Sequence, residues 1–220
     1  MSEFTEKLGS QESKKTWVIL GSAPTPTIPH SKIADSTLVC VNASGLVASK
    51  SRLPVPDLTI MSGYMAVPPR NEIEKTTRNA ISGLNTKGLV WIDRGCTFAD
   101  AKARLENLDY GYETATVFTH EQRSQIVKQI TGADLANQSG DRKISTGLFA
   151  VCFALYRGAS EVILSGISLS TGGYDYCQLP KERKHSLPDQ TAISKLLEAN
   201  LPVKTSEKAL SDQTGLPLVN

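Results

Sequence analysis

The stretch TWVILGSA, residues 16–23, decides the fold. Its apolar residues at 17–20 follow one another without polar alternation, which is typical of a short strand buried on both faces of a parallel sheet. Small residues follow this run at once, beginning with Gly21, Ser22 and Ala23. They predict a tight turn at the carboxyl end of the strand, where either a ligand's phosphate approaches the backbone or the chain simply leaves the sheet.

Six further stretches have the composition of strands: 37–44, 57–63, 88–93, 114–120, 161–167 and 201–206. Helical stretches alternate with them at 71–81, 98–107, 121–130, 147–157 and 189–199. This alternation implies an α/β protein with a mostly parallel sheet that is covered by helices. We find no linker and no internal repeat. The sequence thus predicts a single Rossmann-like, doubly wound domain over 16–220, after a flexible polar tail at 1–15.

The clearest helix is 147–157, where apolar residues recur at helical spacing. Ser145 and Thr146 precede it as candidate N-caps, and Gly158 follows it as a candidate C-cap. Asp189 is expected to cap the last predicted helix in the same way. These capping residues set the expected ends of both helices.

The charge balance narrows the classes of partner. The chain has 24 Lys and Arg against 22 Asp and Glu, a net charge of +2, which by itself gives no reason to expect a nucleic-acid partner. No apolar run reaches the roughly 18 residues that a membrane span requires. Residues 1–15 also lack the apolar core of a signal peptide. Contact with a membrane surface and association into homo-oligomers both stay open.

Cysteine usage favours a reducing compartment. Four cysteines are present, and no C-x-x-C pair provides the usual zinc spacing. Cys40 and Cys152 lie in apolar runs that are typical of buried thiols, which fits a cytoplasmic protein. The chain also lacks G-x-G-x-x-G, a Walker A loop, G-x-S-x-G and H-E-x-x-H. We therefore expect neither a metal ion nor a cofactor.

The stretch 168–188 is polar and glycine-rich and has no clear period. A loop of this length inside a compact domain is usually either a functional lid or disordered, and we expect a short lid over 169–187. His185 lies near its end, just before a helix. The other histidines, His30 and His120, have no such context. His185 is therefore either the general base of a reaction or a solvated side chain.

Four segments in order resemble the bacterial lipooligosaccharide sialyltransferase family: VILGSAPT, CVNASG, KISTGLFAVCFALYRGASEVILSGISLSTGGYDY, and HS before a helix. The resemblance runs over 16–207 and is strongest at 143–176. Members of that family use CMP-sialic acid on a single Rossmann-like domain with a lid. The resemblance implies a glycosyltransferase that moves sialic acid, or a related keto-sugar acid, from a CMP-activated donor to a glycan or lipooligosaccharide acceptor. It also implies single displacement with inversion.

The resemblance assigns roles to individual residues. It implies that His185 is the general base and that Tyr176 binds the departing phosphate. The nucleotide is expected to contact Gly21, Ser22, Ala23, Asn42 and Ser170. Gly166 is expected to line the same cleft because it also follows a parallel strand. The donor sugar or the acceptor is expected to contact Ser62, Lys143, Ser145, Thr146 and Gly147.

The chain departs from the family pattern at four of these positions. Ser22 and Ser62 stand where the family has asparagine, and Lys143 stands where it has arginine. Ser170 replaces one of two tyrosines that bind the donor phosphate. These departures favour a second hypothesis, a catalytically silent nucleotide- or sugar-binding protein, whereas the retained base and second tyrosine favour the transferase. A nucleotide hydrolase is a third hypothesis, but the chain has no acidic motif to support it.

Overall fold

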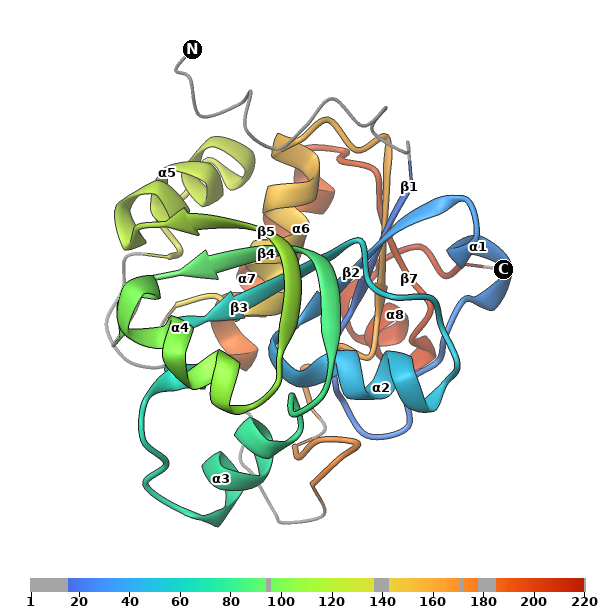
Figure 1. Ribbon diagram of the computed structural model, residues 1–220. Helices are drawn as coiled ribbons and strands as arrows, with labels where there is room; N and C mark the ends of the chain where they lie inside the picture. Colours follow the sequence, from blue (N-terminus) through green and yellow to red (C-terminus); the bar gives the residue numbers. More distant parts are fainter. Residues whose placement is uncertain (1–15, 94–95, 137–142, 171, 178–184, 220) are drawn as a thin grey trace.

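The computed structural model of the protein describes residues 16–93, 96–136, 143–170, 172–177 and 185–219. These residues form one sheet of seven strands in the order β5-β4-β3-β2-β1-β6-β7, with helices on both faces (Figure 1). Every pairing between neighbouring strands is parallel. The predicted Rossmann-like α/β architecture is therefore confirmed. The tail expected at 1–15 and the lid residues 171 and 178–184 lie outside the described chain.

Each of the seven stretches predicted as strands overlaps one. The strands are β1 (Thr16–Leu20), β2 (Ser36–Val41), β3 (Leu58–Ser62), β4 (Asn85–Ile92), β5 (Gly111–Phe118), β6 (Glu161–Ser165) and β7 (Val203–Thr205). β4 and β5 begin three residues earlier than predicted, because Asn85 pairs with Gly111 and Thr86 with Tyr112. The residues in this early pairing do not form an apolar run, so a search for apolar runs does not detect them.

Eight α-helices and two short 3₁₀ helices are assigned within the described residues. They are α1 (His30–Ile33), η1 (Asn42–Ser44), α2 (Gly45–Lys50), η2 (Gly63–Ala66), α3 (Glu72–Asn79), α4 (Phe98–Asn107), α5 (His120–Thr131), α6 (Thr146–Tyr156), α7 (Ser186–Glu198) and α8 (Lys208–Thr214). The five predicted helices are present. The prediction missed α1, α2 and α8, which have only four, six and seven residues. Elements this short have too few turns to show a periodic apolar pattern.

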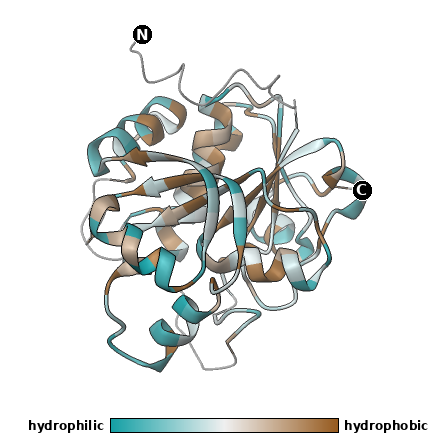
Figure 2. Cartoon of the chain, in the orientation of Figure 1, coloured by the Kyte–Doolittle hydropathy of each residue, from teal (hydrophilic) through white to brown (hydrophobic). Residues whose placement is uncertain are grey.

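The side chains of β1 alternate between two buried layers. Trp17 and Ile19 pack in the cluster that contains α5, α6 and α7, whereas Val18 and Leu20 pack with residues of α1 and α2. Because both faces are covered, the central strands carry continuous apolar runs (Figure 2). α6 lies so deep in its layer that residues 147–154 are all buried. Among the described residues, no helix has the length and hydropathy to cross a membrane.

Ser145 caps α6 as predicted, because its side chain accepts a hydrogen bond from the backbone of Leu148. The expected cap at Asp189 is wrong. α7 begins at Ser186, so Asp189 lies inside its first turn, fully buried. The Asp189 carboxylate instead accepts the Ser145 N–H at 2.7 Å. A buried carboxylate that accepts a backbone N–H of another helix couples the beginning of α7 to the beginning of α6.

Candidate active site

A cavity of about 580 Å³ opens at the carboxyl edge of the sheet, where ligands of doubly wound folds bind. Polar residues at the ends of β1, β2 and β3 form its floor, and α3, the start of α6 and the segment 174–176 form its walls. Eight of the predicted site residues line it together: Ser22, Asn42, Ser62, Lys143, Ser145, Thr146, Tyr176 and His185. Five others, Gly21, Ala23, Gly147, Gly166 and Ser170, are not part of its lining.

The turns after β1 and β6 pack against each other and form backbone hydrogen bonds. The Gly21 N–H donates to the Ser165 carbonyl at 2.8 Å, and the Ala23 N–H donates to the Gly166 carbonyl at 2.9 Å. The Gly166 N–H is bound by the Glu207 carboxylate at 2.6 Å. These backbone groups therefore hold β1, β6 and the start of α8 together. The crevice at the switch between β1 and β6 is filled, and the cavity lies over β1 to β4.

Gly147 and Ser170 have other surroundings. A Cβ atom on Gly147 would lie 2.6 Å from Cδ1 of Ile167, so this glycine lets α6 approach the segment after β6. Ser170 is exposed, and its backbone N–H is bound by the Ser168 side chain at 3.3 Å. Neither residue is part of the cavity lining.

Asn42 is held in one orientation on the cavity floor. It adopts the left-handed backbone conformation, with φ of 51°, which asparagine tolerates better than most residues. Its Oδ1 accepts the Ser62 N–H at 3.0 Å. A backbone N–H only donates, so this contact fixes which end of the amide is the oxygen. The Nδ2 group of Asn42 is then the donor that a ligand in the cavity can use.

Tyr176 is held against the turn after β1. Its ring stacks on that of Tyr174, with centroids 5.0 Å apart and planes 12° apart. Its hydroxyl interacts with the side chains of Ser22 and Thr77, and burial raises the pKa of the phenol above its ordinary value. The backbone of Asp175 donates to the Ser22 carbonyl at 3.0 Å. The phenol therefore stays protonated at neutral pH and is a preoriented hydrogen-bond donor.

His185 lies at the N-terminus of α7, and its Nδ1 is 2.9 Å from the Lys143 carbonyl oxygen. A carbonyl oxygen only accepts, so Nδ1 carries the proton in this contact. In the neutral ring Nε2 then holds the lone pair, which is the state of a general base. The bond from Asp189 to the N–H of Ser145 also ties α7 to the chain just after Lys143. The tautomer and the position of the imidazole are thus both fixed by the fold.

Sequence reasoning missed several charged residues of the cavity wall, of which Arg123 is the most buried, with 3% exposure. Its Nη2 donates to the Ile144 carbonyl at 2.8 Å, and its guanidinium lies 5.4 Å from the centre of the Phe149 ring. A signal was available, because Arg123 falls on the same helical face as Val127 and Ile130. A charge on an apolar helical stripe marks a buried polar site.

The wall residues at the start of α3 and on it were also missed: Arg70, Glu74, Thr77 and Arg78. The predicted helix at 71–81 has few apolar residues, so its charged side chains read as an ordinary solvated face. Within the described residues, no cluster of three His, Cys, Asp or Glu side chains could hold a metal ion.

The chain was compared with known proteins. No family model and no curated protein sequence matches it. Solved structures of sialyltransferases do match. CstII from Campylobacter jejuni with the substrate analogue CMP-3FNeuAc has a TM-score of 0.58 and 16% identity, over 94% of this chain and 86% of that chain. The sialyltransferase CST-II with a trisaccharide acceptor and CMP has a TM-score of 0.58 and 14% identity, over the same shares.

The monofunctional α-2,3-sialyltransferase Cst-I from Campylobacter jejuni matches as well. Its TM-score is 0.56 and its identity 11%, over 94% of this chain and 82% of that chain. At such low identities the similarity establishes only the fold. The chemistry has to be inferred from the residues of the cavity. The chain is similar to these sialyltransferases in fold over nearly its whole length.

Proposed function

We propose that this protein is a glycosyltransferase that moves sialic acid, or a related keto-sugar acid, from a CMP-activated donor to a hydroxyl of a glycan acceptor. One observation carries the proposal. A single cavity is lined by a histidine whose Nδ1 is engaged by the Lys143 carbonyl and by a half-buried, protonated phenol, that of Tyr176. These are the two groups that such a transfer requires, a base for the acceptor and a donor for the leaving group.

The cavity suits a nucleotide-sugar. Its volume of about 580 Å³ falls within the roughly 300–1,000 Å³ of most small-molecule sites. The Asn42 amide is turned so that Nδ2 can donate to the cytidine or the ribose. Ser145 and Thr146 line the cavity at the start of α6, where their hydroxyl groups can donate hydrogen bonds to the carboxylate of a keto-sugar acid. CMP complexes of structures with the same fold support this assignment.

The reaction would be one displacement with inversion. His185 Nε2 takes the proton of an acceptor hydroxyl while the acceptor oxygen forms a bond to the anomeric carbon. On the opposite face of the sugar, the bond from this carbon to the phosphate oxygen breaks. CMP leaves with the electron pair, and the Tyr176 hydroxyl donates a hydrogen bond to the phosphate as its charge grows. The proton ends on His185, and no oxidant or further reactant is needed.

Ligand-dependent stabilisation tests the nucleotide. We expect CMP and CTP to raise the melting temperature, and UMP, GMP and NAD to have little effect. A bound ligand at 100 times its Kd adds about 2.7 kcal/mol to the free energy of unfolding, which is large enough to measure. Release of CMP from CMP-sialic acid in the presence of a glycan then tests transfer. Cytidine-selective binding without transfer would support the silent binding protein instead. No cytidine preference at millimolar ligand would contradict the transferase and would leave the silent protein only as one that binds another nucleotide or a sugar.

The phenol of Tyr176 gives a separate prediction. We expect Tyr176→Phe to lower the transfer rate by roughly 10- to 100-fold, the worth of one hydrogen bond to a charged group. CMP binding should weaken less, because the phosphate charge grows in the transition state. Tyr110→Phe is the matched control: this buried phenol bonds to Thr59 and lies outside the cavity. Equal rates for the two variants would remove Tyr176 from the mechanism.

A further inference from the structure

Arg78 is a nearly buried cation in the cavity wall. Its side chain is only 12% exposed. Its Nε and Nη1 atoms are buried and find no hydrogen-bond partner among the described residues. Removing a guanidinium from water without acceptors for its donors is costly. Burial also lowers the pKa of Arg78, which reflects the same loss of hydration. A buried cation of this kind calls for an anion that the described residues do not supply in full.

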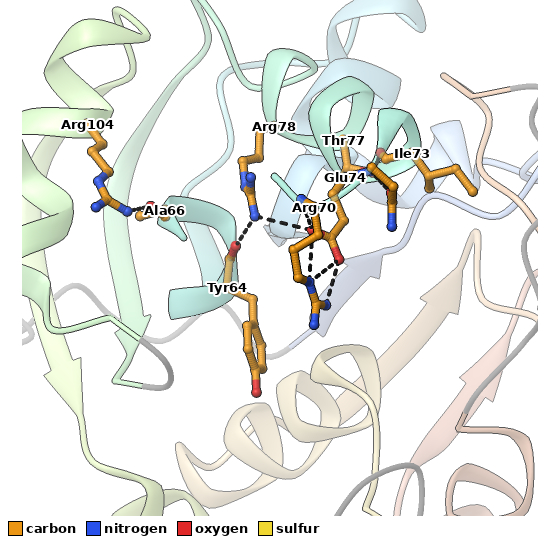
Figure 3. A network of polar contacts seen from close by, with 9 residues as sticks. Tyr64, Ala66, Arg70, Ile73, Glu74, Thr77, Arg78 and Arg104 are labelled. Carbon is orange, nitrogen blue, oxygen red and sulfur yellow. Dashed lines mark hydrogen bonds and ion pairs between the residues drawn. The ribbon is translucent and has the colours of Figure 1, made fainter. Parts of the chain in front are cut away.

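The contacts that Arg78 does make are long. Its Nη2 lies 3.4 Å from the Tyr64 carbonyl oxygen and 3.7 Å from Oε2 of Glu74 (Figure 3). Glu74 is bound more closely to Arg70, at 2.6 Å from Nη2 and 2.8 Å from the backbone N–H. Hydrogen bonds from Arg70 lower the pKa of Glu74 to about 2. Glu74 therefore pairs mainly with Arg70, and the positive charge of Arg78 is only weakly compensated by its described neighbours.

The other charged side chains of the cavity wall are also mostly positive. Four cationic side chains line the cavity, those of Arg70, Arg78, Arg123 and Lys143, and Glu74 is the one acidic residue among its described lining. The net positive charge of the wall favours an anionic ligand. Because the contacts of Arg78 are long, its guanidinium can turn toward such a ligand without losing strong bonds.

Arg78 lines the same cavity as the group assigned to the leaving phosphate. Thr77, the residue before it on α3, interacts with the Tyr176 hydroxyl through its side chain. Thr77, Arg78 and Tyr176 all line the cavity. Arg78 and Tyr176 therefore line one cavity from two different elements, α3 and the segment 174–176.

We propose that Arg78 binds the phosphate of the CMP-activated donor together with Tyr176 and stabilises its negative charge as CMP departs. This inference rests on the proposed function, and it adds α3 to the donor site. A phosphate oxygen is a good partner for a guanidinium, which is planar, permanently charged and rich in donors. The interaction strengthens in the transition state, when the phosphate gains charge.

Calorimetric titration of four proteins tests the proposal: the wild type, Arg78→Gln, Arg78→Lys and Arg104→Gln. Arg104 is the matched control, because its Nη1 donates to the Ala66 carbonyl of η2 much as Arg78 contacts Tyr64, and it does not line the cavity (Figure 3). The probes are CMP, cytidine and inorganic phosphate. We expect Arg78→Gln to weaken CMP binding by about 10- to 100-fold, as for hydrogen bonds to charged groups. Cytidine should bind Arg78→Gln and the wild type equally.

The other arms separate the possible results. Arg78→Lys should lie between the wild type and Arg78→Gln, and Arg104→Gln should bind CMP normally. CMP binding by Arg78→Gln at wild-type strength would overturn the inference and leave the proposed function standing. Equal weakening of CMP and cytidine would also overturn it, because the phosphate would not be the group contacted. If the wild type had no cytidine preference but bound phosphate through Arg78, the anion site would stand and the proposed function would fail.

Discussion

Replacing His185 with alanine should lower the rate of transfer by roughly 10²–10⁴-fold, which is the usual contribution of a general base. CMP affinity should stay within a few-fold of the wild type. The reason is geometric: Nδ1 is engaged by the Lys143 carbonyl, so Nε2 is the nitrogen that can act on an acceptor hydroxyl. Such a contact acts on the acceptor in the transition state and contributes little to holding the nucleotide in the ground state.

Single-turnover rates with CMP-sialic acid and a glycan acceptor, combined with CMP titrations, separate the two effects. His30→Ala is the control, because His30 is an exposed histidine on α1 outside this cavity. A wild-type rate in His185→Ala would end the mechanism as written. A joint fall in melting temperature, CMP affinity and rate would instead assign His185 a packing role at the start of α7.

The strands could be predicted because the sheet is buried on both faces. A doubly covered parallel strand needs an unbroken apolar run, and the run around Trp17 has no other easy explanation. The helices depended on length: α6 has 11 residues and showed its period, whereas α1 has four and did not. The end of a helix was harder to predict, as Asp189 shows. A residue of a type that usually caps its own helix can instead accept a hydrogen bond from the start of another helix when the fold brings the two together.

Part of the cavity follows from topology alone. Ser22, Asn42 and Ser62 end or follow parallel strands, so the sheet had to bring them to one edge. For Gly166 the same rule gives the edge of the sheet and not the packing of two adjacent turns, so a nucleotide contact there stays a prediction. Arg78 could not be predicted. Its burial depends on how α3 packs against the preceding η2, and nothing in the local pattern distinguishes it from a solvated arginine.

The close packing of the turns after β1 and β6 leads to a second large effect, on stability. A Cβ atom at Gly21 would lie 2.3 Å from the Gly166 carbonyl oxygen and 3.0 Å from its carbonyl carbon. Both are backbone atoms of the neighbouring central strand's turn, and they cannot move aside as a flexible side chain can. Gly21 does not have the left-handed backbone conformation, so steric contacts alone oppose alanine there, with the Gly166 backbone and also with Cγ1 of Ile167 at 3.1 Å.

We therefore expect Gly21→Ala to lower the free energy of unfolding by about 3 kcal/mol or more, the upper part of the range for overpacking. In a domain of this size that corresponds to a melting temperature lower by roughly 6–12 °C. Urea unfolding followed by circular dichroism measures it. Gly45→Ala is the control, since its added Cβ meets only a methyl group of Leu84, at 3.3 Å. Unchanged stability of Gly21→Ala with loss of CMP binding would favour a nucleotide contact at Gly21 over the packing role, because a turn that accepts a Cβ is not closed against β6.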